Sequence, residues 1–307
     1  MQRTRVALPL VLAALAGCGD DQSATDPDTL GREAEEVSGF DSARAFSDLE
    51  AQVAIGPRPA GSPASQETAR LIAARLRDAG AEDVVIQKPW LNVVGTLPGA
   101  QAGTVVVGAH HDTKNRIPDF VGANDGASGV AVLLELARTL PRPLPGPSVQ
   151  LVAFDAEEAR GSRPFELDGA RGSRQYVELA ASGRGEGTPP LDQIRAMVLF
   201  DLVGDCDLQI PRELNSDRDL YARFAAAAER GSGSPAPFEG EAPPISDDHT
   251  PFLEAGIPAV DLIDFTFGPG PTPGQYWHTP LDTLDKVCPA SLDAVGEAAL
   301  VAIPEIR

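Results

Sequence analysis

Two adjacent glutamates, Glu157 and Glu158, follow a short apolar run in the sequence VQLVAFDAEEA. The run from residue 151 to residue 154 is typical of a strand buried in a parallel sheet. Open α/β sheets bind ligands beyond the carboxyl ends of their strands, which is where this pair would lie. Because adjacent side chains diverge, one carboxylate could bind a metal ion while the other transfers protons. An isolated Glu-Glu pair is more often a solvated acidic turn, since charged residues are mostly exposed.

The 4 histidines and several acidic residues also stand at the ends of expected strands and loops. His110 and His111 follow an apolar run, His249 lies in the tripeptide DDH, and His278 lies in a long Pro/Gly loop. The acidic residues in such positions are Asp112, Asp125, Glu157, Glu158, Asp201, Asp247 and Asp248. If strand ends converge on one edge of a sheet, these imidazoles and carboxylates would suit zinc, which accepts N and O ligands. Solvated loops remain the alternative.

Strand-like and helix-like segments alternate along the chain, which predicts one doubly wound, three-layer α/β domain with a mostly parallel sheet. Apolar runs predict strands at residues 84–87, 104–109, 151–154, 196–200 and 257–263. Helical patterns cover residues 41–55 and 63–79, with Asp41 and Ser62 as N-caps. Further helices are expected from residues 125–128 onward, from 173, at 217–230, at 250–254 and from 289. Residues 160–172 are expected to form a loop.

Composition limits the possible functions. The chain has 307 residues, 42% of them hydrophobic, which is ample for a globular core. Its formal net charge of −20 argues against a nucleic-acid surface, which needs a basic footprint. We therefore expect no nucleic-acid partner.

The N-terminus has the pattern of an export signal. Basic residues precede an apolar stretch at residues 6–16 that is too short to span a bilayer. The sequence LAGC resembles a bacterial lipoprotein signal, in which Cys18 would carry the lipid. We expect a signal peptide at 1–18, a disordered tether at 19–38, and a folded domain at 39–307. The protein would then be exported to the bacterial cell envelope and contact the membrane only through that anchor.

Cys206 and Cys288 are the other cysteines. They could pair in an oxidising compartment, but the sequence does not reveal their proximity. The expectation is two independent thiols.

Six ordered motifs together resemble the zinc-dependent M28 peptidase family. They are GAHHDT, GANDGASGVA, VAFDAEEA, LFDLVG, DDHTPFL and YWHTPLDTLDKV, and the resemblance covers residues 41–302. It implies a phosphorylase/hydrolase-like fold of the zinc-exopeptidase type with a central mixed sheet. It also implies zinc and a peptide substrate with a free N-terminus, and leaves the oligomeric state unknown.

The resemblance leaves two branches of the family open. In the di-zinc aminopeptidases the ligands would be His110, a bridging Asp125, Glu158, Asp201 and His278, with Glu157 as general base. In the animal-type glutaminyl cyclases one zinc would be held by Asp125, Glu158 and His278. Glu157 would then shuttle a proton, supported by Asp201 and Asp247.

Three details favour the cyclase branch. Asp247 stands where aminopeptidases usually have serine, Trp277 precedes His278 as a substrate-packing tryptophan does in cyclases, and DLVG resembles their DLIG stretch. Trp277 could instead be a loop aromatic buried for stability. GANDGASG and HTPLDTLDKV are closer to the peptidases, and the two cysteines do not match the cyclase disulfide.

The expected function is therefore cyclisation of N-terminal glutamine to pyroglutamate with release of ammonia. The first alternative is a di-zinc aminopeptidase. A non-catalytic binding domain on the same fold is the third reading, and the complete ligand set weighs against it.

Overall fold

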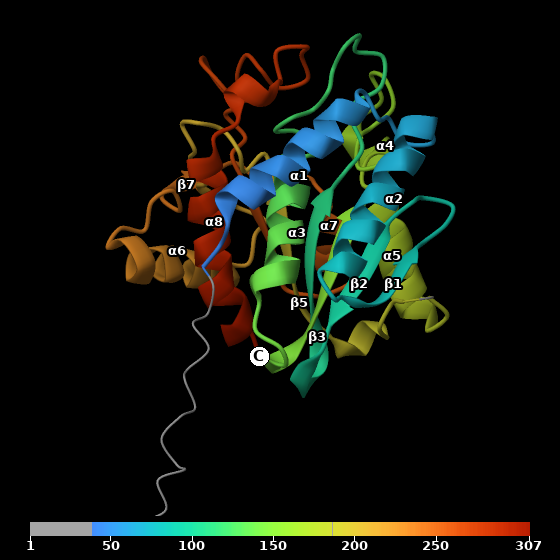
Figure 1. The fold of residues 1–307 in the computed structure, drawn as a ribbon, viewed down its shortest axis with the longest axis vertical. Helices are drawn as coiled ribbons and strands as arrows, with labels where there is room; N and C mark the ends of the chain where they lie inside the picture. Colours follow the sequence, from blue (N-terminus) through green and yellow to red (C-terminus); the bar gives the residue numbers. More distant parts are fainter. Residues whose placement is uncertain (1–38, 186) are drawn as a thin grey trace, which may run out of the picture. The chain divides into compact units, whose positions relative to one another are not determined.

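A mixed sheet runs through the part of the chain that the computed structural model describes, residues 39–185 and 187–307 (Figure 1). Its 6 strands lie in the order β1-β2-β4-β3-β5-β8. The contacts from β4 to β8 are parallel, whereas β1 and β2 pair antiparallel at one edge. The strands are β1 (Glu82–Ile86), β2 (Val93–Leu97), β3 (Gly99–His110), β4 (Leu144–Phe154), β5 (Ile194–Asp201) and β8 (Ala259–Ile263). A separate parallel pair is formed by β6 (Arg212–Glu213) and β7 (Glu241–Ala242).

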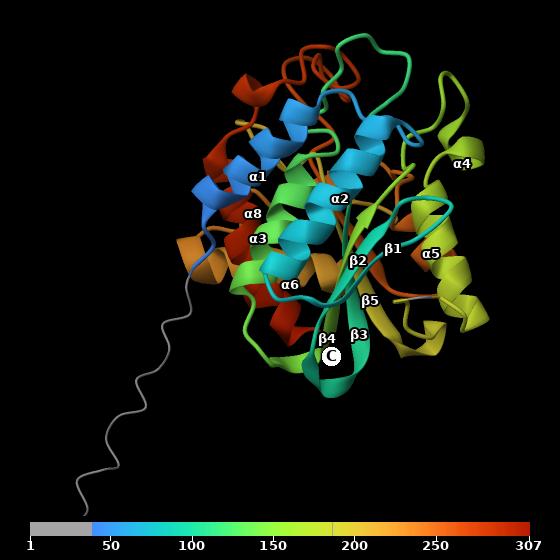
Figure 2. The same ribbon diagram turned by 45° about the vertical axis from the view of Figure 1, so that its right-hand side comes forward.

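Helices cover both faces of the sheet, as Figures 1 and 2 show. One face packs against α1 (Ser42–Ile55), α2 (Pro63–Asp78), α3 (Ser128–Thr139), α6 (Arg218–Ser232) and α8 (Pro289–Ala302). The other packs against α5 (Arg171–Ser182) and α7 (Thr250–Glu254). The short α4 (Phe165–Asp168) lies in the loop between β4 and α5. The three-layer, mostly parallel fold expected from the sequence is therefore confirmed.

The central strand β3 shows how the sequence specifies this arrangement. Val105 and Val107 face the larger apolar cluster with α3, whereas Val106 faces the opposite cluster with Tyr176 and Phe252. Because both faces are covered, the strand is a continuous apolar run rather than an alternating one. The run ends at His110, where the chain leaves the sheet.

The expected N-caps are confirmed. The Asp41 side chain accepts a hydrogen bond from the Arg44 backbone, and Ser62 does the same for Ser65. Among the described residues, no helix is both long enough and apolar enough to cross a bilayer. The expected signal peptide and tether lie outside these residues.

The sequence interpretation missed β2, α4 and the short pair β6 and β7, and it misplaced one helix start. Strand β2 was missed because it is short, contains Gly95, and lies between proline-containing turns. A Cβ at Gly95 would approach Leu76 Cδ1 to 3.2 Å, so glycine allows α2 to pack closely on this strand. The region expected to be a loop contains α4, and α5 begins at Arg171 rather than Ser173.

The expectation of two independent thiols was wrong. Cys206 and Cys288 form a disulfide that joins the segment after β5 to the start of α8. The two segments also pair through the bridge between Asp205 and Val287 and through a hydrogen bond from Cys288 N to Gly204 O. A separation of 82 residues hid this proximity in the sequence.

Removing this cross-link should destabilise the domain. The double variant Cys206→Ser/Cys288→Ser should lose about 2–4 kcal/mol of unfolding free energy, because its unfolded chain is no longer closed into a long loop. Denaturant unfolding of the two proteins measures the difference. Reductant should destabilise the wild type but leave the double variant unchanged, and equal stability of the two proteins would contradict the expectation.

Candidate metal centre and active site

The carboxyl ends of three neighbouring parallel strands bring the candidate site together. His110 ends β3 and Asp201 ends β5, while Glu157 and Glu158 follow β4 by a few residues. The loop before α3 supplies Asp125, and a loop after β8 supplies His278. In Figure 1 these loops gather beyond the same edge of the sheet.

Two potential ligand clusters share Asp125. His110, Asp125 and Asp201 form one, and Asp125, Glu158 and His278 form the other, with the donor atoms of each within 4.8 Å of one another. His110 Nε2 lies 3.3 Å from both Asp125 Oδ1 and Asp201 Oδ1. On the other side, His278 Nε2 lies 3.0 Å from Glu158 Oε1 and 3.4 Å from Asp125 Oδ2. The two oxygens of Asp125 thus face different histidines.

The donor atoms suit a zinc ion chemically. Ligands about 2.0–2.1 Å from a tetrahedral zinc are about 3.3–3.4 Å apart, close to the separations measured here. All the carboxylates are buried, and Asp125 Oδ2 has no hydrogen-bond partner. Buried charges are normally paired or bound to metal, so a cation would satisfy this group.

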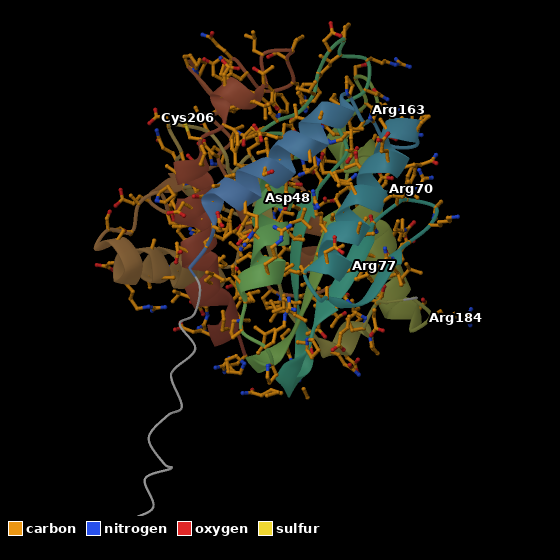
Figure 3. All side chains as sticks on the ribbon, in the orientation of Figure 1. Asp48, Arg70, Arg77, Arg163, Arg184 and Cys206 are labelled. Carbon is orange, nitrogen blue, oxygen red and sulfur yellow. A yellow bond between two sulfur atoms is a disulfide. The ribbon has the colours of Figure 1, made fainter. Side chains whose placement is uncertain are left out.

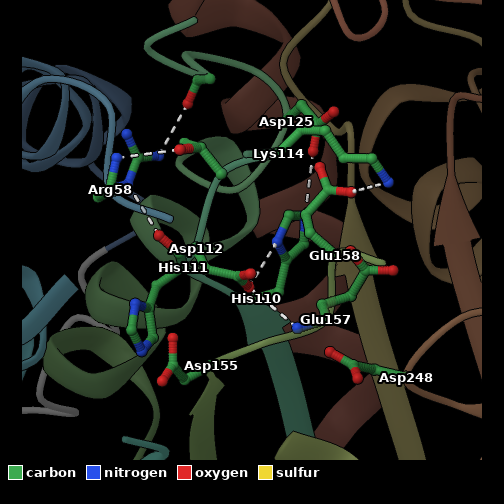
Figure 4. Close-up of polar contacts among 12 residues, drawn as sticks. Arg58, His110, His111, Asp112, Lys114, Asp125, Asp155, Glu157, Glu158 and Asp248 are labelled. Carbon is green, nitrogen blue, oxygen red and sulfur yellow. Dashed lines mark hydrogen bonds and ion pairs between the residues drawn. The ribbon is translucent and has the colours of Figure 1, made fainter. Parts of the chain in front are cut away.

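Figure 4 shows the adjacent side chains of Glu157 and Glu158, whose pKa values shift in opposite directions. Burial raises the pKa of Glu157 well above its usual range, and Glu158, Asp247 and Asp248 raise it further. Burial would also raise the pKa of Glu158, but His278 and then Lys114 lower it to about 2. Lys114 Nζ lies 3.1 Å from Glu158 Oε2. Neighbouring carboxylates with opposite pKa shifts are suited to different roles, proton transfer for Glu157 and metal binding for Glu158.

The backbone turns that aim these side chains are strained. Ala156, Leu202 and His278 all have positive φ, at 59°, 49° and 52°. The first precedes Glu157, the second follows Asp201, and the third is itself a potential ligand. Non-glycine residues avoid this region, and such strain is often found at functional sites. The turn at Ala156 is held by hydrogen bonds from Arg171 N to its carbonyl and from Ala170 N to the Glu157 carbonyl.

A second layer of acidic side chains orients the candidate ligands. Asp282 accepts hydrogen bonds from the backbone N–H groups of Asn124 (2.7 Å) and Asp125 (3.0 Å). Asp112 Oδ1 accepts from Glu157 N at 3.0 Å and lies 3.7 Å from His110 Nδ1. Gly126, with φ 96°, allows the backbone at residue 126 to pass close to the backbone of Asp112, because a Cβ at Gly126 would lie 2.6 Å from Asp112 O. Partners of this kind fix ligand orientation in metal sites.

Asp247 lies among the acidic groups around Glu157. It is buried and lines the same cavity as Glu157 and Asp201. Burial raises its pKa well above the usual range, and Asp201 and Asp248 add to the shift. Burial also raises the pKa of Asp248 to about 7. Protons are therefore readily held within this group of carboxyls.

Trp277 lines the cavity, stacked on the candidate ligand His278 with ring centroids 3.7 Å apart. Its ring also meets the edge of Phe265 at 5.3 Å. It therefore shapes the wall beside His278.

Two histidines do not join the clusters. His111 points away from His110 in Figure 4, and its Nε2 lies 3.2 Å from Leu91 O. His249 is fully buried, with Nε2 3.4 Å from Glu213 Oε1. Both side chains therefore contact other parts of the fold and not the candidate ligands, although in the sequence they stand beside the same acidic motifs.

The sequence interpretation missed Asp282, Lys114 and Arg58. Asp282 stands four residues after His278 in the motif HTPLD, which was a usable signal. Arg58 is buried and donates to the carbonyl oxygens of His111 (2.8 Å) and Gly122 (2.8 Å). It lies in a Pro/Gly loop that gave no indication of such a role.

A buried cluster of carboxylates and imidazoles at this edge of a mixed sheet has the ligand types that zinc accepts. Residues 92–303 match the sequence profile of peptidase family M28, and the chain belongs to that family.

Relatives with a named activity include both branches. A glutaminyl-peptide cyclotransferase of Boiga irregularis is 29% identical over 250 residues, covering 71% of this chain and 66% of that protein. This chain thus matches slightly less than two thirds of that relative's length. The glutaminyl cyclase structure of an Acidobacteriales bacterium is 30% identical with a TM-score of 0.76, covering 93% and 99% of the two chains. A leucine aminopeptidase precursor from Bacteroides thetaiotaomicron is 25% identical with a TM-score of 0.72, covering 88% and 99%.

Removing the hydrogen bonds that hold the backbone at Asp125 should weaken metal binding. Asp282→Asn replaces one acceptor oxygen with an NH₂ group that cannot accept from the Asn124 and Asp125 amides, so zinc affinity should fall about 10- to 100-fold. Competition with a zinc chelator measures this affinity. The matched control is Asp285→Asn in the same loop, where an exposed side chain pairs with Lys286 and affinity should stay unchanged. Unchanged affinity in both variants would contradict the role of Asp282.

Proposed function

We propose that this protein is a zinc-dependent glutaminyl-peptide cyclotransferase that converts N-terminal glutamine to pyroglutamate and ammonia. The observation that carries the proposal is Asp247, an acidic residue buried beside Asp201 and Asp248 in the cavity of Glu157. Burial raises the pKa values of Glu157, Asp247 and Asp248, and carboxyls with raised pKa values can accept a proton and pass it on. The names of the cyclotransferase and cyclase relatives support the same activity.

The metal would be held by Asp125, Glu158 and His278. When bound there, zinc would polarise the γ-carboxamide carbonyl of the substrate glutamine as a Lewis acid. Lys114, on the second oxygen of Glu158, would keep that carboxylate charged and oriented. Trp277 would support the His278 ring from one side and pack on the substrate from the other.

Glu157 would carry out the proton transfers. The substrate's α-amine attacks its own side-chain carbonyl carbon, so the reacting atoms already belong to one residue and proximity is largely built in. A carbon–nitrogen bond forms to close the ring, and the bond to the side-chain nitrogen breaks. Glu157 accepts the amine proton and delivers it to the departing nitrogen, which leaves as ammonia. The neighbouring carboxyls of Asp247 and Asp201 would influence whether Glu157 is protonated, so that it can accept the proton in one step and deliver it in the next.

A di-zinc aminopeptidase is the second candidate. Its specific support is the complete second cluster of His110, Asp125 and Asp201, together with the aminopeptidase among the similar structures. In that case Glu157 would be the base that activates water for hydrolysis of the first peptide bond. A non-catalytic binding domain is disfavoured because both clusters retain all their donors.

The folded domain at residues 39–307 would act on peptides with a free N-terminus outside the cytoplasm. Residues 1–18 as a lipoprotein signal and 19–38 as a tether complete this proposal, with Cys18 as the anchor in the bacterial envelope.

Zinc content and product analysis should distinguish the two candidates. The cyclase should contain one zinc per chain and release ammonia from a glutamine-initiated peptide without hydrolysing aminoacyl amides. Elemental analysis and an ammonia assay, run beside an amide-hydrolysis assay, provide the measurements. Two zinc ions with amide hydrolysis and no cyclisation would establish the aminopeptidase instead.

Variants at Glu157 and His278 should separate chemistry from metal binding. Glu157→Gln should lower turnover at least about 10²-fold through loss of the acid–base group while retaining zinc. His278→Ala should lose zinc, because it removes one of the three proposed ligands, Asp125, Glu158 and His278. The control His111→Ala alters the buried histidine outside the clusters and should keep its zinc. Full zinc occupancy in His278→Ala would refute the ligand assignment.

A further inference from the structure

An exposed arginine lines the mouth of the catalytic cavity although the protein is strongly acidic. The cavity has a volume of about 530 Å³ and includes Arg163 as well as Glu157 and His278 in its lining. A site of this size accommodates ligands larger than one amino-acid side chain. Since cyclisation involves only the first residue, the following residues of the substrate must extend past the mouth.

Residues 160–171 form one side of this mouth, and they carry an excess of positive charge. Asp168 is buried and pairs with Arg160 (2.5 Å), Arg163 (3.2 Å) and Arg171 (3.3 Å). One carboxylate thus faces three guanidinium groups, and Glu166, which is exposed and also lines the cavity, is the other acidic side chain of this segment. Three arginines against two acidic residues leave this segment with one net positive charge.

A second loop adds to this charge. Asn115 Oδ1 accepts a hydrogen bond from Gly161 N at 2.8 Å, which joins the two loops. A Cβ at Gly161 would lie 3.2 Å from Arg116 Nη1, so this guanidinium packs directly against the 160–171 segment. Lys114 also lines the cavity, but Glu158 neutralises it. Arg116 and Arg163 are therefore exposed cations beside the opening, and Arg160 is a third.

The ion pair between Arg163 and Asp168 leaves the Arg163 side chain available to a ligand. Its side chain is 64% exposed, whereas Asp168 is 4% exposed and also held by Arg160 and Arg171. Arg163 can therefore turn toward an incoming carboxylate without freeing the segment. Guanidinium groups bind carboxylates through paired hydrogen bonds, which suits an Asp or Glu side chain.

The cavity thus has opposite charges at its two ends, with carboxylates around Glu157 in its interior and guanidinium groups at its mouth. We propose that the site selects peptides with Asp or Glu at the second or third position, and that Arg163 is a specificity-determining residue supported by Arg116. This inference rests on the proposed function, in which the first residue is glutamine.

The test compares three peptides that differ only at the second residue, Gln-Glu, Gln-Gln and Gln-Lys. The wild type should show kcat/KM about three- to fivefold higher for Gln-Glu than for Gln-Gln, as exposed ion pairs allow, with Gln-Lys lowest. Salt of about 0.5 M should remove most of the difference, because exposed charges are screened. Arg163→Gln should lower the Gln-Glu advantage, and Arg163→Gln/Arg116→Gln should abolish it.

The matched control is Arg184→Gln. Arg184 is exposed and far from Arg163 in Figure 3, so its loss changes the net charge equally without touching the mouth. It should keep the wild-type preference. Equal kcat/KM for Gln-Glu and Gln-Gln in the wild type, or a preference that survives the double variant, would overturn the inference.

A binding measurement separates this inference from the proposed function. Calorimetry with Glu157→Gln compares the affinities of the same peptides without turnover. If the wild type cyclises none of them, the proposed function fails, and tighter binding of Gln-Glu that needs Arg163 still supports the basic mouth. If cyclisation occurs without any preference in rate or affinity, the function stands and the inference fails.

Discussion

Carboxylates that share a buried space repel one another, and this repulsion is the constraint on which the structure depends. Asp125 lies within a few ångströms of Asp201 in one cluster and of Glu158 in the other, each with a histidine. Water is largely excluded, so the charges must be balanced by bound cations, by imidazolium or by protonation. The negative side chains would favour a bound metal ion, and burial raises the pKa of the neighbouring Glu157 carboxyl well above its usual range. The same burial that makes the cluster unfavourable to fold thus makes it chemically useful.

Rigid surroundings keep the cluster assembled. Arg58 binds the loop after β3 through carbonyl oxygens, and Asp282 binds the turn before α3 through backbone amides. Strained turns at Ala156 and Leu202 direct the side chains beyond β4 and β5 into the same space. These contacts come from segments far apart in sequence, so the geometry of the site depends on the whole sheet being in register.

The sheet and most helices could be predicted because their patterns are local. β3 and β4 are continuous apolar runs, and Asp41 and Ser62 carry recognisable capping chemistry. The candidate ligands could also be found, since each stands at a strand or loop end in a family motif. The sequence does not reveal which distant segments lie close together in the fold. The Cys206–Cys288 bond and the role of Arg58 depend on tertiary contacts that leave no periodic signal. His111 and His249 were ambiguous for the same reason, because motif membership does not reveal which way a side chain points.

The position of the disulfide has a consequence for when the enzyme becomes competent. Cys206 lies five residues beyond Asp201, and Cys288 lies ten residues beyond His278. The bond therefore ties together the two polypeptide segments that carry candidate ligands from opposite clusters. Gly204, within the same segment, also accepts from Cys288 N and donates to Asn124 Oδ1, beside the shared aspartate. Formation of the bond would therefore fix these two segments against each other, and the reduced chain would hold its candidate ligands less firmly in place.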